Sequence, residues 1–181
     1  MVRFILIYFY LIVVRVFRIA FRPFITGDTN YLSTPVLTIR QILNDPIVQE
    51  YSHFVDIGCG ESIVAFYVRL ILKKTVVVTD LQPYFLRLAK VTKRLFFVSD
   101  VDVLDELSAN SSINGVYFCV WTSWSNENQH QFLSQIQSTV PKGSMLITVS
   151  HALGHPAFQC LKSTSFRFAW GHASVYYYKH D

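Results

Sequence analysis

Charged residues are scarce in this chain, at 15% of 181 residues, and acidic ones are absent from the first 27. That segment has no lysine either, so Arg3, Arg15, Arg18 and Arg22 give it a charge of +4. The chain holds 16 basic residues, so 12 remain beyond this segment, and they balance 12 acidic ones. A neutral remainder argues against a large phosphate-binding face, and we expect no nucleic-acid partner.

Cysteine is also scarce, and its spacing excludes a disulfide framework. Cys59, Cys119 and Cys160 are odd in number, lie far apart and form no C-x-x-C motif. This usage is typical of a protein in a reducing compartment. We expect no metal site, because His151 and His155 have no nearby cysteine or aspartate to complete a ligand set.

The chain has no uninterrupted apolar run long enough for an ordinary bilayer-spanning helix. The N-terminal run at residues 4–14 has 11 uncharged residues, where about 20 are needed. If Arg15 and Arg18 extend their charges to the interface, the run lengthens to about 18. Three interpretations stay open: a membrane anchor, an organelle-targeting segment, and a buried or interfacial helix. We favour membrane association through residues 1–24.

Beyond a turn-rich linker, strand-like and helix-like segments alternate. We expect a helix from Pro35, strands at 53–57, 75–80, 95–99, 115–121 and 144–150, and helices at 62–73, 83–93 and 127–140. Such alternation predicts an α/β fold with a doubly wound, mostly parallel sheet. Strand-like residues 164–170 and 173–179, separated by Gly171 and His172, predict a closing antiparallel hairpin and seven strands in all.

Two acidic residues close neighbouring predicted strands, and glycines follow the first. Asp56 begins the sequence D-I-G-C-G, and Asp80 ends the next strand. Gly58 and Gly60 let the backbone pass close to a ligand where a helix begins. Ile63 stands where a G-x-G-x-x-G dinucleotide loop needs its third glycine. Acids at two adjacent strand ends suit a nucleoside without phosphates, with Asp80 accepting from ribose hydroxyls.

Simpler structural roles remain open for the same residues. The D-I-G-C-G segment also fits an ordinary strand-to-helix turn, and Asp80 also fits a cap for a helix that begins near Pro83. Trp121 and Trp124 fit core packing as well as a binding channel. Cys59 stands beside a predicted helix start, but no base of the right kind is close in the sequence.

With these motifs the chain resembles the class I S-adenosylmethionine-dependent methyltransferases over about residues 31–179. It is most similar to the branch that contains the nucleosome-lysine methyltransferases of the disruptor-of-telomeric-silencing type and the membrane-anchored mitochondrial lysine methyltransferases. Four further segments carry this narrower likeness: residues 31–35 (YLSTP), 116–124, 141–145 (PKGSM) and 169–176 (AWGHASVY).

The resemblance implies a set of site residues. The cofactor would be held by Tyr31, Thr34, Asp56, Gly58, Gly60, Asp80 and Asp100. Within this set the first acid and the glycines would meet the methionine part, Asp80 the ribose, and Asp100 the adenine amino group. The catalytic channel, where a substrate amine approaches the methyl group, would be lined by Trp121, Thr122, Ser123 and Trp124.

The implied activity is methyl transfer from S-adenosylmethionine to a protein lysine. Residues 51–181 would form the methyltransferase-like domain, after a linker and helix at 25–50 and the hydrophobic basic segment at 1–24. The implied location is intracellular and membrane-associated, with the mitochondrion as one candidate. Ser62 stands where the family usually has a third glycine, and Glu61 adds an acid beside it. An inactive membrane-bound interaction module and a small-molecule methyltransferase are therefore alternatives.

Overall fold

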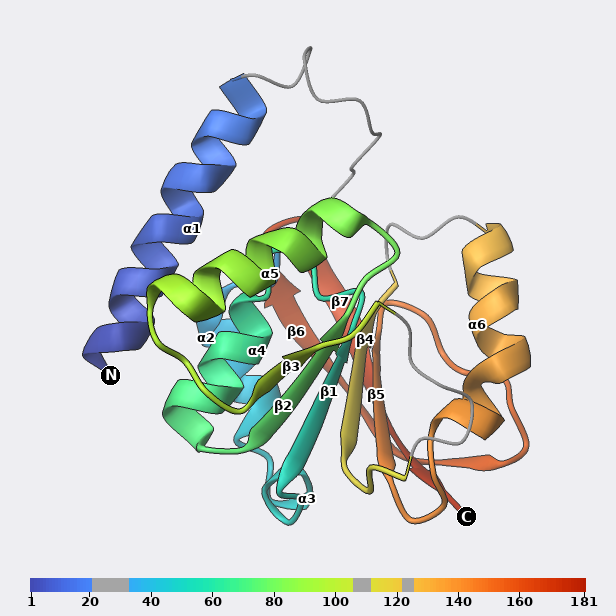
Figure 1. The fold of residues 1–181 in the computed structure, drawn as a ribbon. Coiled ribbons are helices and arrows are strands. Elements are labelled where there is room, and N and C mark those ends of the chain that lie inside the picture. Colours follow the sequence, from blue (N-terminus) through green and yellow to red (C-terminus); the bar gives the residue numbers. More distant parts are fainter. Residues whose placement is uncertain (21–32, 106–111, 122–125) are drawn as a thin grey trace.

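Seven strands form one mixed sheet at the centre of the molecule (Figure 1). The computed structural model describes all of the chain except residues 21–32, 106–111 and 122–125. The strands are β1 (His53–Ile57), β2 (Thr75–Thr79), β3 (Val101–Val103), β4 (Val116–Val120), β5 (Met145–Val149), β6 (Phe158–Phe168) and β7 (Gly171–His180). Their order is β3-β2-β1-β4-β5-β7-β6, with β1 to β5 parallel and β7 antiparallel to both neighbours. The predicted doubly wound sheet with a closing hairpin is confirmed.

Helices cover both faces of this sheet. They are α1 (Val2–Ala20), α2 (Val36–Leu43), α3 (Pro46–Gln49), α4 (Ile63–Tyr67) with its π-helical continuation η2 (Val68–Leu72), α5 (Pro83–Leu95) and α6 (Asn126–Thr139). In Figure 1, α2, α4 and α5 lie on one side of the sheet and α6 on the other. The core is divided in the same way, since α2, α4 and α5 contribute to one buried cluster and α6 to a second.

Strand residues supply both clusters by alternation. Phe54 and Val76 pack in the first cluster, whereas Val55 and Val77, one residue further along each strand, pack in the second. Successive side chains of a strand point to opposite faces. This is why the central strands read as continuous apolar runs, and why their positions are largely predictable from the sequence.

The third strand lies further along the chain than predicted, at Val101–Val103 instead of 95–99. The apolar residues before it complete α5, whose last turn is closed by a hydrogen bond from Phe96 N–H to the Thr92 carbonyl (3.1 Å). Phe97 then turns the chain with φ +51°. Helix and strand share the same apolar residue types here, so composition alone placed the boundary wrongly.

The closing hairpin turns two residues earlier than predicted. Gly171 pairs with Phe168, so Ala169 and Trp170 form the turn and Gly171 belongs to β7. Gly171 has φ +126°, a conformation that favours glycine. The hairpin passes the end of β5, where Val149 pairs with Val175. It therefore reaches beyond the carboxyl edge of the parallel strands.

The N-terminal segment forms one helix that packs against the domain by one side. Phe4, Ile7 and Leu11 of α1 are buried in the first cluster, and the Phe4 ring meets Tyr67 of α4 edge-on, with centroids 5.5 Å apart. We predicted a membrane anchor in this segment. Within the part of the chain that the structure describes, no helix combines the length and hydropathy needed to cross a membrane.

Candidate functional site

The glycine loop after β1 is fixed at the carboxyl edge of the sheet by backbone hydrogen bonds. The N–H groups of Gly58 and Cys59 donate to the Thr79 carbonyl at the end of β2, at 2.9 and 3.0 Å. Gly58 and Gly60 have φ values of +72° and +51°, in the region that favours glycine. The two glycines therefore allow the chain to turn sharply from β1 toward α4.

Asp80 joins this loop to the start of α5. One carboxylate oxygen accepts from Gly60 N–H (2.9 Å), and the other accepts from Gln82 N–H (2.8 Å). Asp80 therefore does the structural work of ordering the turn before Pro83. Each carboxylate oxygen has a second lone pair, so these bonds leave acceptor capacity for a ligand hydroxyl.

Asp56 is the electrostatically unusual residue of the site. It is only 3% exposed, and among the described residues its Oδ2 atom has no hydrogen-bond partner. Burial, followed by the charge of Asp80, raises its pKa to about 8, against a lowering effect of a backbone hydrogen bond from Ala65. Burial also raises the pKa of Asp80. Asp56 therefore retains its proton at neutral pH until a positive group comes close.

Ser62 occupies the position of the missing third glycine and adopts a glycine-like conformation. Its φ and ψ are +58° and 23°, and its side chain makes no capping hydrogen bond to α4. Instead its hydroxyl contacts the Cys59 sulfur (3.3 Å). Glu61 beside it is buried, at 1% exposed. The loop thus keeps its path at Ser62 with some backbone strain.

Within the described residues, neither a nucleophilic cysteine nor a metal site accompanies this loop. Burial, followed by the charge of Asp56, raises the pKa of the Cys59 thiol well above its usual value, so it is a poor nucleophile. Across the described residues, no three histidine, cysteine or acidic side chains gather as a metal site. His155 instead accepts a hydrogen bond from Ala157 N–H at Nδ1 (3.2 Å).

Of the predicted channel residues, only Trp121 is described, and it is packed into the core. It is 2% exposed, its indole N–H donates to the His151 carbonyl (3.2 Å), and its ring meets Phe132 edge-on at 5.6 Å. This arrangement is the packing role that the sequence left open. Thr34 is buried just before α2. The other predictions lie outside the described residues: Tyr31, Thr122, Ser123 and Trp124.

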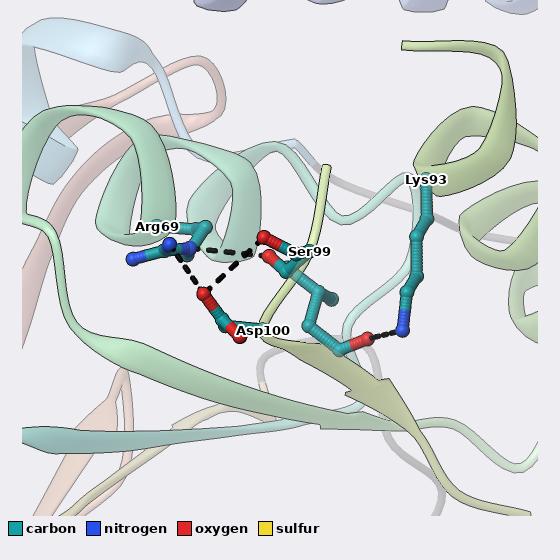
Figure 2. Close-up of polar contacts among 5 residues, drawn as sticks. Arg69, Lys93, Ser99 and Asp100 are labelled. Carbon is teal, nitrogen blue, oxygen red and sulfur yellow. Dashed lines mark hydrogen bonds and ion pairs between the residues drawn. The ribbon is translucent and has the colours of Figure 1, made fainter. Parts of the chain in front are cut away.

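The structure does not bring Asp100 to the edge that carries Asp56 and Asp80. Its carbonyl accepts from Val76 N–H (3.0 Å) at the beginning of β2, so Asp100 stands at the amino end of β3. Figure 2 shows its carboxylate bound to the Arg69 guanidinium (2.5 Å) and to the Ser99 hydroxyl. The reason is the later start of β3, which reverses the end of the strand at which this acid lies.

Asp105, which was not singled out in the sequence, and Trp170, which is part of the 169–176 segment, lie toward the carboxyl edge. Leu104, directly after β3, donates its N–H to the Val78 carbonyl (3.0 Å). Asp105 is the next residue, and the Asp105 side chain is 82% exposed. The alternating sequence D-V-D-V-L at 100–104 was the signal for this strand. Trp170 lies at the hairpin tip, and its buried indole nitrogen has no hydrogen-bond partner within the described chain.

Several solved structures share this architecture, and two of the three described next are methyltransferases by their printed names. An RNA methyltransferase from Salinibacter ruber, in complex with S-adenosyl-L-homocysteine, has a TM-score of 0.65 at 12% identity, with 82% of this chain and 94% of that chain covered. TrmN from Thermus thermophilus has a TM-score of 0.64 at 13% identity, with 80% and 48% covered. A precorrin-6y C5,15-methyltransferase from Geobacter metallireducens has a TM-score of 0.60 at 9% identity, with 86% and 94% covered.

Similarity is confined to the structure. No protein-family model matches the sequence, and no curated protein sequence does. The chain spans about half the length of the Thermus protein, at 48%, and nearly all of the other two. At identities of 9–13% the likeness bears on the fold alone. The chain has the Rossmann-like methyltransferase fold.

Proposed function

We propose that this protein binds S-adenosylmethionine at the carboxyl ends of β1 and β2 and transfers its methyl group to an acceptor. The observation that carries the proposal is the buried Oδ2 of Asp56 next to the glycine loop, which has no hydrogen-bond partner among the described residues. A buried acceptor without a partner is costly in a folded protein unless a ligand satisfies it. The fold shared with an S-adenosyl-L-homocysteine complex supports the same ligand class.

The residues present fit this cofactor. Asp56 offers a carboxylate that a positive group would ionise, and S-adenosylmethionine has both an ammonium and a sulfonium. Gly58 and Gly60 leave room over the loop, because neither has a side chain. Asp80 retains lone pairs for ribose hydroxyls beside its bonds to Gly60 and Gln82. Asp105, two residues after the carboxyl end of β3, is our candidate for the role predicted for Asp100.

The chain's own contribution would be positioning and exclusion of water. S-adenosylmethionine supplies a methyl group that is already activated by the sulfonium. The apolar residues below the loop, Ile57 and Ile63, are 7% and 4% exposed and keep this edge of the core dry. Such a site needs to align a neutral acceptor with the methyl group more than it needs a strong base.

For the acceptor, we propose a protein lysine, which rests on the resemblance carried by residues 31–35, 116–124, 141–145 and 169–176. A small-molecule acceptor is the second candidate, favoured by the shared architecture of the precorrin methyltransferase. The two candidate acceptors are distinguished by their methylated products. Incubation of the purified chain with radiolabelled S-adenosylmethionine and cell lysate, followed by separation of protein, RNA and small molecules, identifies the acceptor class. Label confined to RNA or small molecules would contradict lysine.

Cofactor binding is tested by calorimetric titration of the full chain. Wild type should bind S-adenosylmethionine, and Asp80→Asn should weaken binding by about 10- to 100-fold, because a charged acceptor for buried hydroxyls is lost. Asp102→Asn is the matched control, since Asp102 lies on β3 with a side chain 66% exposed. No binding by wild type at about 1 mM cofactor, or equal losses in both variants, would reject the proposed site.

A further inference from the structure

Helix α1 has a second apolar face, which the described part of the domain does not cover. Ile7 and Leu11 are fully buried on the inner side, whereas Leu6 and Phe9 are 53% and 62% exposed. Exposed apolar residues recur every three or four positions and thus line one side of the helix. We define the α1 outer face by the residues Val2, Ile5, Leu6, Phe9, Val13 and Val16. Figure 1 shows α1 lying along the outside of the molecule.

The end of α5 extends this apolar surface. Phe96 meets Tyr10 of α1 edge-on, with ring centroids 5.6 Å apart, so the end of α5 lies against α1. The next residue, Phe97, is 83% exposed and has φ +51°. A large apolar side chain with this exposure buries little surface within the fold, and its left-handed backbone is strained. Leu95 is exposed beside it, so the end of α5 that packs against α1 also presents exposed apolar side chains.

Charge on these two helices has one sign. The sequences of α1 and α5 contain no acidic residue, and their basic residues are Arg3, Arg15, Arg18, Arg87, Lys90, Lys93 and Arg94. Two acids of the adjoining segment are already paired, Asp105 with Lys90 and Asp102 with Lys93, at 3.3 and 3.9 Å. An apolar stripe with exclusively positive helix charges complements an anionic lipid surface.

We propose that the α1 outer face and Phe97 lie on an anionic membrane surface, with α1 parallel to the membrane plane. A spanning orientation would require Ile7 and Leu11 to leave the domain core. A second copy of the chain is disfavoured as the occupant, because the sequence of α1 has three arginines and no acidic residue, so two α1 helices placed together would carry charge of one sign. The inference is independent of methyl transfer and concerns where the protein resides.

The test is co-sedimentation of the full chain with vesicles. We expect binding to phosphatidylcholine vesicles that contain about 30% phosphatidylserine, and little binding to phosphatidylcholine alone. Raising NaCl from about 0.1 M to about 0.5 M should weaken binding about tenfold, because the charge attraction is screened. Leu6→Ser/Phe9→Ser should abolish binding, whereas Leu37→Ser/Leu161→Ser, at other exposed leucines, should retain it.

A second variant separates membrane contact from folding. Phe97→Gly suits the positive φ, so it should raise the melting temperature while it weakens vesicle binding several-fold. Titration with S-adenosylmethionine should give the same affinity for wild type, Leu6→Ser/Phe9→Ser and Phe97→Gly. Failure of the membrane proposal can therefore be told apart from failure of the cofactor proposal.

Any of the following results would overturn the proposal. One is equal vesicle binding by wild type and Leu6→Ser/Phe9→Ser, or no binding by wild type. Another is retention in the membrane after alkaline carbonate extraction, which indicates a spanning helix. The third is a concentration-dependent dimer in sedimentation that Leu6→Ser/Phe9→Ser dissociates, which would assign the outer face to a second copy.

Discussion

At the scale of single residues, Asp56 should make the stability of the protein fall as the pH rises. Its pKa is about 8 in the folded chain and 3.8 ordinarily. Between these values the folded state holds a proton that the unfolded state has lost, so higher pH favours unfolding. One such group changes the free energy of unfolding by up to about 1.4 kcal/mol per pH unit.

Asp56→Asn removes this titration while keeping the shape of the protonated acid. Between pH 5 and pH 8, the free energy of unfolding of the variant should rise relative to that of wild type by up to about 4 kcal/mol, measured by urea unfolding at each pH. The same substitution should weaken the binding of S-adenosylmethionine, because the ionisable carboxyl group is lost. Parallel stability curves for the two proteins would show that the Asp56 carboxyl ionises normally.

Ser62 offers a second residue-scale prediction. It holds φ at +58° without a capping bond from its side chain, so Ser62→Gly should stabilise the protein by about 0.5–1 kcal/mol. Ser165→Gly, at an exposed position in β6 without positive φ, should instead destabilise it. Chemical denaturation measures both. A loss of stability in Ser62→Gly would mean that the Cys59 contact outweighs the backbone strain.

At the scale of elements, hydrogen bonds from Lys74 connect α3 and the residues after it to the start of β2. It is 6% exposed, and its ammonium donates to the carbonyls of Val48 (3.1 Å), Gln49 (3.3 Å) and Tyr51. Lys74→Met leaves these carbonyls short of a donor, and we expect a loss of about 2–3 kcal/mol in the free energy of unfolding.

The neighbouring lysine provides the control for this prediction. Lys73 is exposed at the end of η2, so Lys73→Met should change the stability by less than about 0.5 kcal/mol. Thermal unfolding of the two variants beside wild type is sufficient. Similar behaviour of both would mean that the Lys74 ammonium is replaceable by water in solution.

At the scale of the whole molecule, α1 should contribute to stability through its inner side alone. Ile7 is fully buried and Phe9 is 62% exposed. Ile7→Ala should therefore cost about 2–4 kcal/mol, through lost burial and a cavity, while Phe9→Ala should change stability by less than about 0.5 kcal/mol. Denaturant unfolding in the absence of lipid measures the difference. Two equally mild variants would show that α1 does not pack on the domain.

How far the sequence predicts each part differs with the kind of signal. The central strands β1, β2, β4 and β5 follow from apolar runs, because both faces of a parallel sheet are buried. The boundary between α5 and β3 does not follow, because the apolar run at 95–98 is not a strand: Phe96 and Val98 pack on the core after α5, while Leu95 and Phe97 are exposed. That error carried Asp100 to the wrong edge of the sheet, whereas Asp56 and Asp80 were placed correctly beside each other at the ends of β1 and β2.

Local periodicity and turns that require glycine were enough to predict the α/β alternation, the terminal hairpin, the glycine loop and its pair of acids from the sequence. Long-range packing settles which side of α1 is buried, which end of β3 carries which acid, and how Trp121 packs. Each depends on contacts between residues far apart in the chain, such as Phe4 with Tyr67. Local patterns carry no information on such pairings.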